Sequence, residues 1–233
     1  IYCNKDVQDC VFDGSKLAGF RGDARGCSYI GTTIAKSYGA TFENCDLTDT
    51  RFEAIAEYRV DPELEISMTD CRAARLHAND RVFDDKAVFH NVQFPGASFA
   101  GCVFNGTRFT QCDLTDANFK DSILIGTQFI DCKLAGACFD GAYILNTVFQ
   151  SSDTGDASFA DVRRLGTELP DGRSFDDLPQ PELSEEPGRW QMNFNKAKRC
   201  SGRWRSTRPK KCLSACARRK GLASSPTKRG FGW

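Results

Sequence analysis

The sequence predicts an all-β solenoid, a stack of square coils around a filled interior, and three observations lead to this fold class. From residue 87 to residue 161 a five-residue unit recurs fifteen times without a slip. The centre of the unit is large and apolar in fourteen of the fifteen cases, and a small side chain stands two residues before each centre. Two residues after the centre, thirteen of the fifteen units carry Gly, Asn or Asp.

A period of five fits neither a helix, which has 3.6 residues per turn, nor a strand, in which side chains alternate with period two. The pattern instead requires a corner every five residues, and Gly, Asn and Asp accept the turn conformations that a corner imposes. Two residues separated by two positions on a short extended side both point inward. Four such sides close a coil of about twenty residues, and coils stacked about 4.8 Å apart pair their backbone groups.

The large apolar centres are expected to point inward and to form columns of side chains that run through the stack. Burying one Phe side chain contributes roughly 2–3 kcal/mol, so a single coil is marginal and the stack is needed. The expected core centres are Phe89, Phe94, Phe99, Phe104, Phe109, Leu114, Phe119, Leu124, Phe129, Leu134, Phe139, Ile144, Phe149 and Phe159. The remaining centre of the fifteen, Thr154, is polar.

Residues 1–86 carry the same unit in a degenerate form. We expect ten further units here, centred on Phe12, Leu17, Tyr29, Ile34, Phe42, Leu47, Phe52, Ile66, Cys71 and Leu76. The stretches Phe20–Gly26, Ile55–Glu63 and Ala78–Lys86 fall out of register, and we interpret them as loops that project from corners or as one bent coil. Together with the regular β-helix at 87–161, these units predict about six coils.

The period is lost after Asp161. Residues 162–189 are expected to form a short cap near Val162–Leu169 and then an acidic, Pro-containing linker. Residues 190–233 contain 13 basic side chains, no acidic one and three Trp, and we expect an irregular or disordered tail. Two alternatives stay open for the tail: nucleic-acid binding by phosphate neutralisation and aromatic stacking, and translation in a shifted frame.

Opposite charges are separated along the chain, although the formal net charge is zero. Residues 1–189 contain all 31 acidic and 18 basic side chains, a net charge of −13, and residues 190–233 carry the balancing +13. The sequence therefore describes an acidic body with a basic tail. No run of 18 apolar residues occurs, so no membrane-spanning helix is expected.

Two consecutive units show a family resemblance. Cys112-Asp113-Leu114-Thr115-Asp116 and the unit at 117–121 resemble the A-(D/N)-(L/F)-x-x unit of the pentapeptide-repeat family. The resemblance implies a right-handed quadrilateral β-helix. It also implies functions, because some members protect DNA gyrase and topoisomerase from inhibitors as acidic rods that resemble duplex DNA. Other members are β-helical targeting modules of larger secreted bacterial effectors, for example beside a ubiquitin-ligase domain.

One outer face of the predicted solenoid is apolar. Every fourth unit shares a side, and the outward positions of one side hold Val103, Ile123, Ile125, Tyr143 and Leu145. An apolar stripe on an otherwise polar rod marks a covered or an interacting surface. Two interpretations stay open: the chain's own linker folds over the stripe, with Leu165 or Leu178, or the stripe binds a partner or a second copy.

Catalytic and metal-binding patterns are sparse. The chain contains two His, His77 and His90, and no phosphate-binding Gly-rich motif. Six cysteines, Cys10, Cys27, Cys45, Cys102, Cys112 and Cys132, occupy the small inward position, so we interpret them as core residues in a reducing compartment. Cys138 is expected to face outward. Cys200, Cys212 and Cys216 lie in the tail and make a weak metal site.

These observations favour a non-catalytic protein-interaction scaffold without cofactor or metal, in the bacterial cytoplasm. The expected partner is a protein, with a type II topoisomerase such as DNA gyrase as the narrower hypothesis. A homodimer is also an expected assembly, and nucleic acid would bind only through the basic tail. The alternative function is a targeting module of a larger secreted effector.

Overall fold

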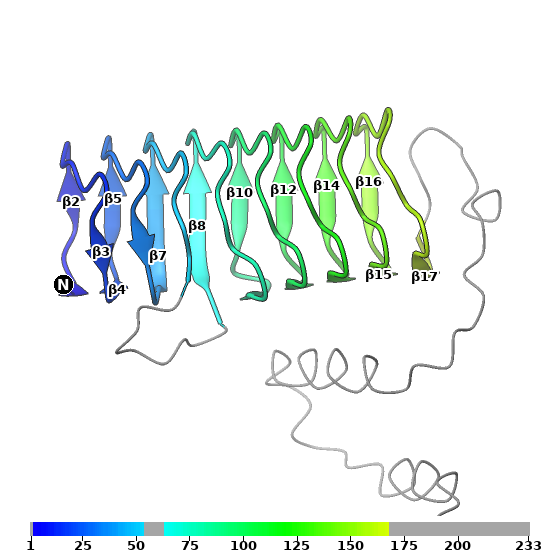
Figure 1. The fold of residues 1–233 in the computed structure, drawn as a ribbon, viewed down its shortest axis with the longest axis horizontal. Helices are drawn as coiled ribbons and strands as arrows, with labels where there is room; N and C mark the ends of the chain where they lie inside the picture. The colour runs from blue at the N-terminus through cyan, green and yellow to red at the C-terminus, as the bar shows by residue number, and fades with distance from the viewer. Residues whose placement is uncertain (1, 54–62, 168–233) are drawn as a thin grey trace, which may run out of the picture. The chain divides into compact units, whose positions relative to one another are not determined.

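The computed structural model describes residues 2–53 and 63–167, which form a stack of eight coils without any helix among them (Figure 1). Each coil passes through four short walls, which we name A to D in chain order. The all-β solenoid predicted from the five-residue period is confirmed, and every strand pair is parallel. The expected count of about six coils is too low.

Wall A is an eight-stranded sheet with one strand from each coil, in the order β16-β14-β12-β10-β8-β7-β5-β2. Its strands, which begin coils 1 to 8, are β2 (Val7–Gln8), β5 (Asp23–Arg25), β7 (Tyr38–Glu43), β8 (Glu65–Thr69), β10 (Val88–His90), β12 (Arg108–Thr110), β14 (Gln128–Ile130) and β16 (Val148–Gln150). This continuous sheet is the row of strands seen along the stack in Figure 1.

Wall D is a five-stranded sheet in coils 4 to 8, in the order β17-β15-β13-β11-β9. Its strands are β9 (Val82–Phe83), β11 (Val103–Asn105), β13 (Ile123–Ile125), β15 (Tyr143–Leu145) and β17 (Arg163–Leu165). Two further pairs join the first coils: β1 (Tyr2–Cys3) with β4 (Gly19–Phe20), and β3 (Lys16–Leu17) with β6 (Thr33–Ile34). Walls B and C are otherwise held by isolated bridges between coils, such as Asp113 with Lys133.

The core consists of columns of aligned centres, one column inside each wall. All fourteen centres predicted in the regular region are 0–3% exposed. Rings that follow one another in a column stack, with centroids 4.9 Å apart for Phe89–Phe109 and Phe119–Phe139. Rings of neighbouring walls meet edge to face, as in Phe119–Phe129 at 5.8 Å. Both arrangements are favoured for aromatic pairs, so each ring is fixed by the coils beside it as well as by its own coil.

The small inward position has a hydrogen-bonding role that the sequence analysis did not identify. The Thr107, Thr127 and Thr147 hydroxyls each donate to the carbonyl of a core centre in the preceding coil, at 3.3 Å. The Cys112 thiol donates in the same way to Phe89 at 3.4 Å, and the Ser152 hydroxyl to Phe129 at 3.1 Å. Thr, Ser and Cys recur at a position where Ala would be large enough. This recurrence could have predicted the hydrogen-bonding role.

The backbone conformation at the corners explains why the unit carries Gly, Asn or Asp two residues after its centre. Corner residues adopt positive φ in most coils, for example Asp116 at 56°, Asp121 at 56° and Gly141 at 66°. Only Gly, Asn and Asp adopt this conformation at low cost. Asp80 and Gly101 occupy the same corner in successive coils, and a Cβ on Gly101 would lie 2.6 Å from the Asp80 carboxylate.

The stretch Phe20–Gly26 is a wall rather than a loop, which corrects the prediction. Phe20 and Ala24 are fully buried, and β4 and β5 continue the parallel ladder. The five-residue pattern loses its register here because coils 1 and 2 contain fewer residues than the later coils. The missing residues all fall on the wall D side. The steps from the wall C centre to the next wall A centre are 7 residues in coil 1 (Leu17 to Ala24), 8 in coil 2 (Ile34 to Phe42), 16 in coil 3 (Phe52 to Met68), 11 in coil 4 (Ala78 to Phe89) and 10 thereafter.

The units expected at Leu64–Ala78 are in the wrong register by two residues. Met68, not Ile66, pairs with Phe89 and is the centre. In the same way Ala73 and Ala78 stand at the centres, and Cys71 and Leu76 occupy the small inward position. Both positions point inward, so a large Leu at one compensates for a small Ala at the other, and the sizes alone do not reveal the register.

The stretch Ala78–Lys86 also belongs to the coil rather than to a loop. Phe83 is fully buried in β9 and stacks on Phe104 at 4.8 Å. Arg81 occupies the small inward position, and its Nε donates to the Phe52 carbonyl at 2.9 Å, while burial lowers the pKa of its guanidinium. Most of the stretch Ile55–Glu63 lies outside the described residues, apart from Glu63, which bridges to Val82.

The repeat continues past Asp161, where the sequence led us to expect a cap. Strand β17 adds a fifth strand to wall D, and Arg164 takes the position of Ile144 in the preceding coil. The Thr147 amide donates to the Thr167 hydroxyl at 3.1 Å, so Thr167 stands in the next inward position. The predicted linker from residue 168 on, including Leu178, and the basic tail lie outside the described residues.

Gly101→Ala should destabilise the protein more than Gly126→Ala. Both glycines have positive φ, so each substitution costs about 1–2 kcal/mol of backbone strain. At Gly101 the Asp80 carboxylate must also move away, which adds roughly 0.5–1 kcal/mol, whereas a Cβ on Gly126 meets nothing within 4 Å. Urea unfolding measures the difference, and Asp80→Gly should remove it. Equal losses for the two glycines would contradict the packing argument.

Tyr29→Phe should stabilise the protein by about 1 kcal/mol. The Tyr29 hydroxyl is buried in the core without a hydrogen-bond partner, and burial raises the pKa of the phenol. Removing an unsatisfied buried hydroxyl while keeping the ring that stacks on Phe12 removes only a cost. Tyr143→Phe is the matched control, because that hydroxyl accepts a hydrogen bond from Arg163. A lower unfolding midpoint for Tyr29→Phe would show that its hydroxyl has a partner.

Candidate functional site

The candidate sites lie on the outer walls, because the interior is filled. Stacked rings about 5 Å apart along each column and edge-to-face contacts between columns leave no space for a ligand between Phe109, Phe119 and Phe129. Recognition therefore depends on the side chains at the outward positions and corners. These side chains repeat from coil to coil, so they form ladders along the stack.

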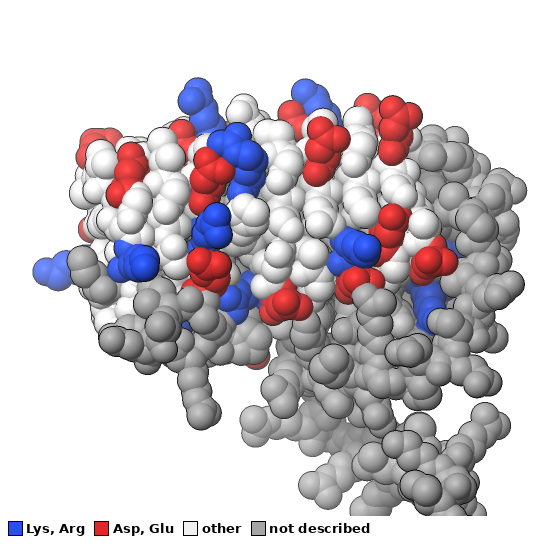
Figure 2. Space-filling model, viewed as in Figure 1, with Lys and Arg blue, Asp and Glu red and all other residues white. Residues whose placement is uncertain are grey.

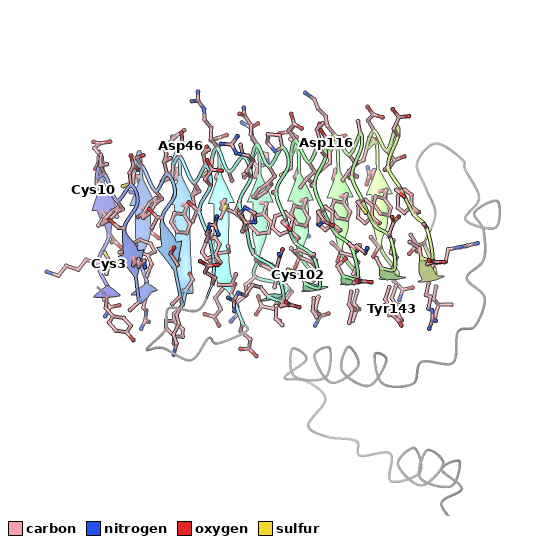
Figure 3. All side chains as sticks on the ribbon, in the orientation of Figure 1. Cys3, Cys10, Asp46, Cys102, Asp116 and Tyr143 are labelled. Carbon is pink, nitrogen blue, oxygen red and sulfur yellow. The ribbon has the colours of Figure 1, made fainter. Side chains whose placement is uncertain are left out.

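The apolar stripe predicted from the sequence is a ladder on the outside of wall D. Val103, Ile123 and Tyr143 follow one another on β11, β13 and β15, and Ile125 and Leu145 form the neighbouring row. Figure 3 shows Tyr143 projecting away from the stack at this wall. Val82, Val103 and Ile123 form a second hydrophobic cluster, separate from the core, against which Ile125 and Tyr143 pack.

The ladder ends in a cationic side chain at coil 8. The Arg163 guanidinium lies over the Tyr143 ring, 5.7 Å from the centroid, and its Nη1 donates to the Tyr143 hydroxyl at 3.4 Å. Arg164, the next residue along β17, takes the position of the core centre Ile144 and is not part of the outer ladder. This end of wall D is therefore positively charged, and a cation–π contact of this kind contributes about 0.5–1 kcal/mol at a partly exposed site.

The second candidate surface is acidic and lies on walls B and C of coils 6 to 8. Eight carboxylates and only two lysines, Lys120 and Lys133, are found between the wall A strands and wall D of these coils. We call it the acidic edge; its carboxylates are Asp113, Asp116, Asp121, Asp131, Asp140, Asp153, Asp156 and Asp161. The face in Figure 2 carries Lys or Arg beside Asp or Glu, separated by uncharged side chains.

Some carboxylates of the acidic edge also hold the coils together. Asp140 accepts hydrogen bonds from the Ser158 hydroxyl at 2.5 Å and the Ala160 amide at 2.9 Å. Burial alone would raise the pKa of Asp140, but these hydrogen bonds favour the charged form and lower it. Asp113 and Asp153 each accept a hydrogen bond from the backbone amide of the residue two positions later in the chain. Asp116 and Asp121 stand at corners with positive φ.

Two arginines of the first four coils pair with carboxylates of a neighbouring coil. The Arg75 guanidinium contacts Asp49 of the preceding coil at 2.6 and 2.8 Å and holds the pKa of Asp49 below its usual range. Arg25 donates to Glu43 of the next coil at 3.0 Å. Each of these exposed pairs is locally neutral, whereas only Lys120 and Lys133 accompany the eight carboxylates of the acidic edge.

The described cysteine and histidine side chains do not form a common site. The nine described cysteines are thiols and form no disulfide among them. Cys45, Cys71 and Cys112 belong to a column of small inward residues inside wall B, whereas Cys102 precedes the wall D centre Phe104. His77 and His90 are exposed on walls C and A. Within residues 2–53 and 63–167, no group of three or more His, Cys, Asp or Glu side chains has the geometry to hold a metal ion. In the same part of the chain, no helix is long and apolar enough to cross a membrane.

Four walls, a five-residue unit and parallel bridges between coils define the class as a parallel β-solenoid built of pentapeptide repeats. Residues 82–133 match the family described as pentapeptide repeats (9 copies). Among curated proteins, none matches this chain.

Solved structures with a similar course of the chain include QnrB1, described as a plasmid-mediated fluoroquinolone resistance protein. It shares 14% identity over 82% of this chain and 99% of its own, with a TM-score of 0.47. HetL from Nostoc sp. strain PCC 7120, described as involved in heterocyst differentiation regulation, shares 15% over 74% and 91%, with a TM-score of 0.33. Rfr23 from Cyanothece 51142 shares 12% over 56% and 88%, with a TM-score of 0.35.

Cys138 should react with iodoacetamide in the folded protein at least about ten times faster than Cys112 or Cys132. Cys138 is half-buried on the outside of wall C, whereas the other two are buried in the column inside wall B. The hydrogen bond with the Cys132 thiol and burial raise the pKa of Cys112, and burial raises the pKa of Cys138 more mildly. Mass spectrometry of alkylated peptides measures the rates, and equal rates would show that the column opens in the native state.

Proposed function

We propose that the protein is a non-catalytic scaffold that binds a protein partner through its outer walls, in the bacterial cytoplasm. The observation that carries this proposal is the filled interior, in which rings such as Phe109 and Phe129 stack 5.0 Å apart. Small-molecule sites are concave and enclose their ligand, and such a core offers no enclosure. Ladders of side chains at a fixed spacing suit an extended protein surface instead.

The narrower proposal is that the partner is a type II topoisomerase such as DNA gyrase, bound through the acidic edge. This edge has eight carboxylates against two lysines, so it attracts a basic DNA-binding surface. The described residues as a whole have 22 acidic and 15 basic side chains, a net charge of −7. Spread over eight coils of about 4.8 Å, that is about one charge per 5 Å, against one per about 1.7 Å in duplex DNA.

This comparison makes the acidic edge, rather than the whole rod, the part that could stand in for DNA. On walls B and C, acidic side chains exceed basic ones by six in coils 6 to 8 and by two in coils 1 to 3. Binding through such an edge should weaken as salt concentration rises, because exposed charges are screened within about 10 Å at 0.1 M salt.

Purified protein should change the supercoiling activity of gyrase, measured with and without a quinolone, and Asp116→Asn with Asp121→Asn should reduce the effect several-fold. Asp9→Asn with Asp70→Asn is the matched control, because all four aspartates stand at corners with positive φ, which Asn also accepts. The control should retain the effect. No effect of the unchanged protein on gyrase would reject the topoisomerase proposal, and equal losses in both variants would reject the acidic edge.

A further inference from the structure

A run of four thiols lies inside wall B in the first four coils. Cys10, Cys27, Cys45 and Cys71 occupy the small inward position two residues before the wall B centre, one in each coil. Cys27, Cys45 and Cys71 are only 1–2% exposed. Cys10, which Figure 3 shows in the first coil, is half-buried. The run therefore leads from a partly accessible thiol into the core.

The sulfur atoms of this run repeat at the spacing of the coils. The Cys45 thiol donates to the Glu43 carbonyl at 3.3 Å and to the Ala24 carbonyl of the preceding coil at 3.4 Å. Cys27 and Cys71 make the equivalent pair of contacts in the coils on either side. Equivalent contacts require equivalent side-chain conformations, so successive sulfurs lie about 4.8 Å apart.

This spacing suits a metal ion held in a line between two sulfurs. Two collinear metal–sulfur bonds of about 2.3 Å place the sulfurs about 4.6 Å apart. A disulfide instead brings the two Cβ atoms to about 3.8 Å, which is about 1 Å less than the coil spacing. Zinc requires three or four ligands around one point, and the described residues contain no such group. Among the soft ions that thiolates select, Cu(I) accepts two ligands in a line.

A buried hydroxyl in the same part of the core points independently to a ligand. Tyr29 is 0% exposed, and its hydroxyl has no hydrogen-bond partner. Burial raises the pKa of this phenol, and Cys27, Cys45, Cys3 and Cys10 raise it further, so the hydroxyl lies among these thiols. A phenol donates readily to an ionised sulfur, which the thiols become when they bind a metal ion.

We propose that Cys27 and Cys45 bind Cu(I) in the core and that the Tyr29 hydroxyl donates a hydrogen bond to the copper-bound sulfurs. Each thiol releases one proton to solvent and forms one copper–sulfur bond, and copper remains Cu(I), so no oxidant or reductant is consumed. The complex carries one negative charge, which the Tyr29 hydroxyl and the Cys10 amide offset; that amide already donates to the Cys27 sulfur at 3.4 Å. The half-buried Cys10 thiol provides the entry route, by exchange of the ion from thiol to thiol.

Anaerobic competition with the chelator bicinchoninate measures the affinity of the full chain for Cu(I), supplied as its acetonitrile complex. Cys200, Cys212 and Cys216 are changed to Ser in every sample, so that only described thiols contribute. Cys27→Ser with Cys45→Ser should lower the affinity at least about a hundredfold, and Tyr29→Phe should lower it about tenfold. Ser is compatible with the column, because Ser152 occupies the same position in coil 8. X-ray absorption at the copper edge should show two sulfur ligands.

Cys112→Ser with Cys132→Ser is the matched control, because these thiols also stand in successive coils of the same column but away from Tyr29. The control should retain the affinity of the parent chain. Equal losses in the two double variants would overturn the proposal, and so would a parent chain that takes no copper from bicinchoninate or holds it with three or more sulfurs. If circular dichroism shows that the ligand variant is unfolded, Cys45→Ala decides by the same readout, because Ala occupies the small inward position elsewhere, as at Ala117.

Discussion

The structure depends on the register between coils. A parallel bridge at every wall places each core centre over the equivalent centre of the neighbouring coil, and the rings of Phe109, Phe129 and Phe149 therefore stack at 5.0 to 5.1 Å. Because side chains alternate between the two faces of an extended segment, a slip of one residue would turn a centre outward. A change in coil length is therefore tolerated only where the chain does not carry a centre.

The five-residue period was sufficient to predict the fold, the four walls and the fourteen core centres from residue 89 to residue 159. It could not give the number of coils, because it treats every unit as equivalent. The coils around Phe20 and Ala24 have fewer residues between the wall C centre and the next wall A centre. A fixed five-residue period therefore loses its register there, and the stretch was interpreted as a loop. In coil 4 the period predicts the wrong centres for a different reason. Leu76 and Ala78 exchange the large and the small side chain between the two inward positions, while their summed volume is kept.

The candidate surfaces were predictable to different degrees. Alternation along a wall places Ile123 and Ile125 outward, so the apolar stripe on wall D follows from the sequence. The acidic edge does not, because Asp is also a corner residue of the unit, as at Asp116, and its number says little about charge at one surface. The burial of Val103 was not predicted either, although the residues that pack beside it, Val82 and Ile123, are its equivalents in the neighbouring coils.

Wall D is where the solenoid accommodates all its irregularities. The shortened steps of coils 1 and 2, the long step of coil 3 and the extra residue of coil 4 all fall between a wall C centre and the next wall A centre. Walls A, B and C consequently remain continuous over eight coils, and their centres stay in register. The buried guanidinium of Arg81 compensates for one such irregularity by satisfying the Phe52 carbonyl. A wall that is free to vary in length without disturbing the core is also free to acquire an apolar outer ladder, since its outward side chains contribute little to the stacking of the other three walls.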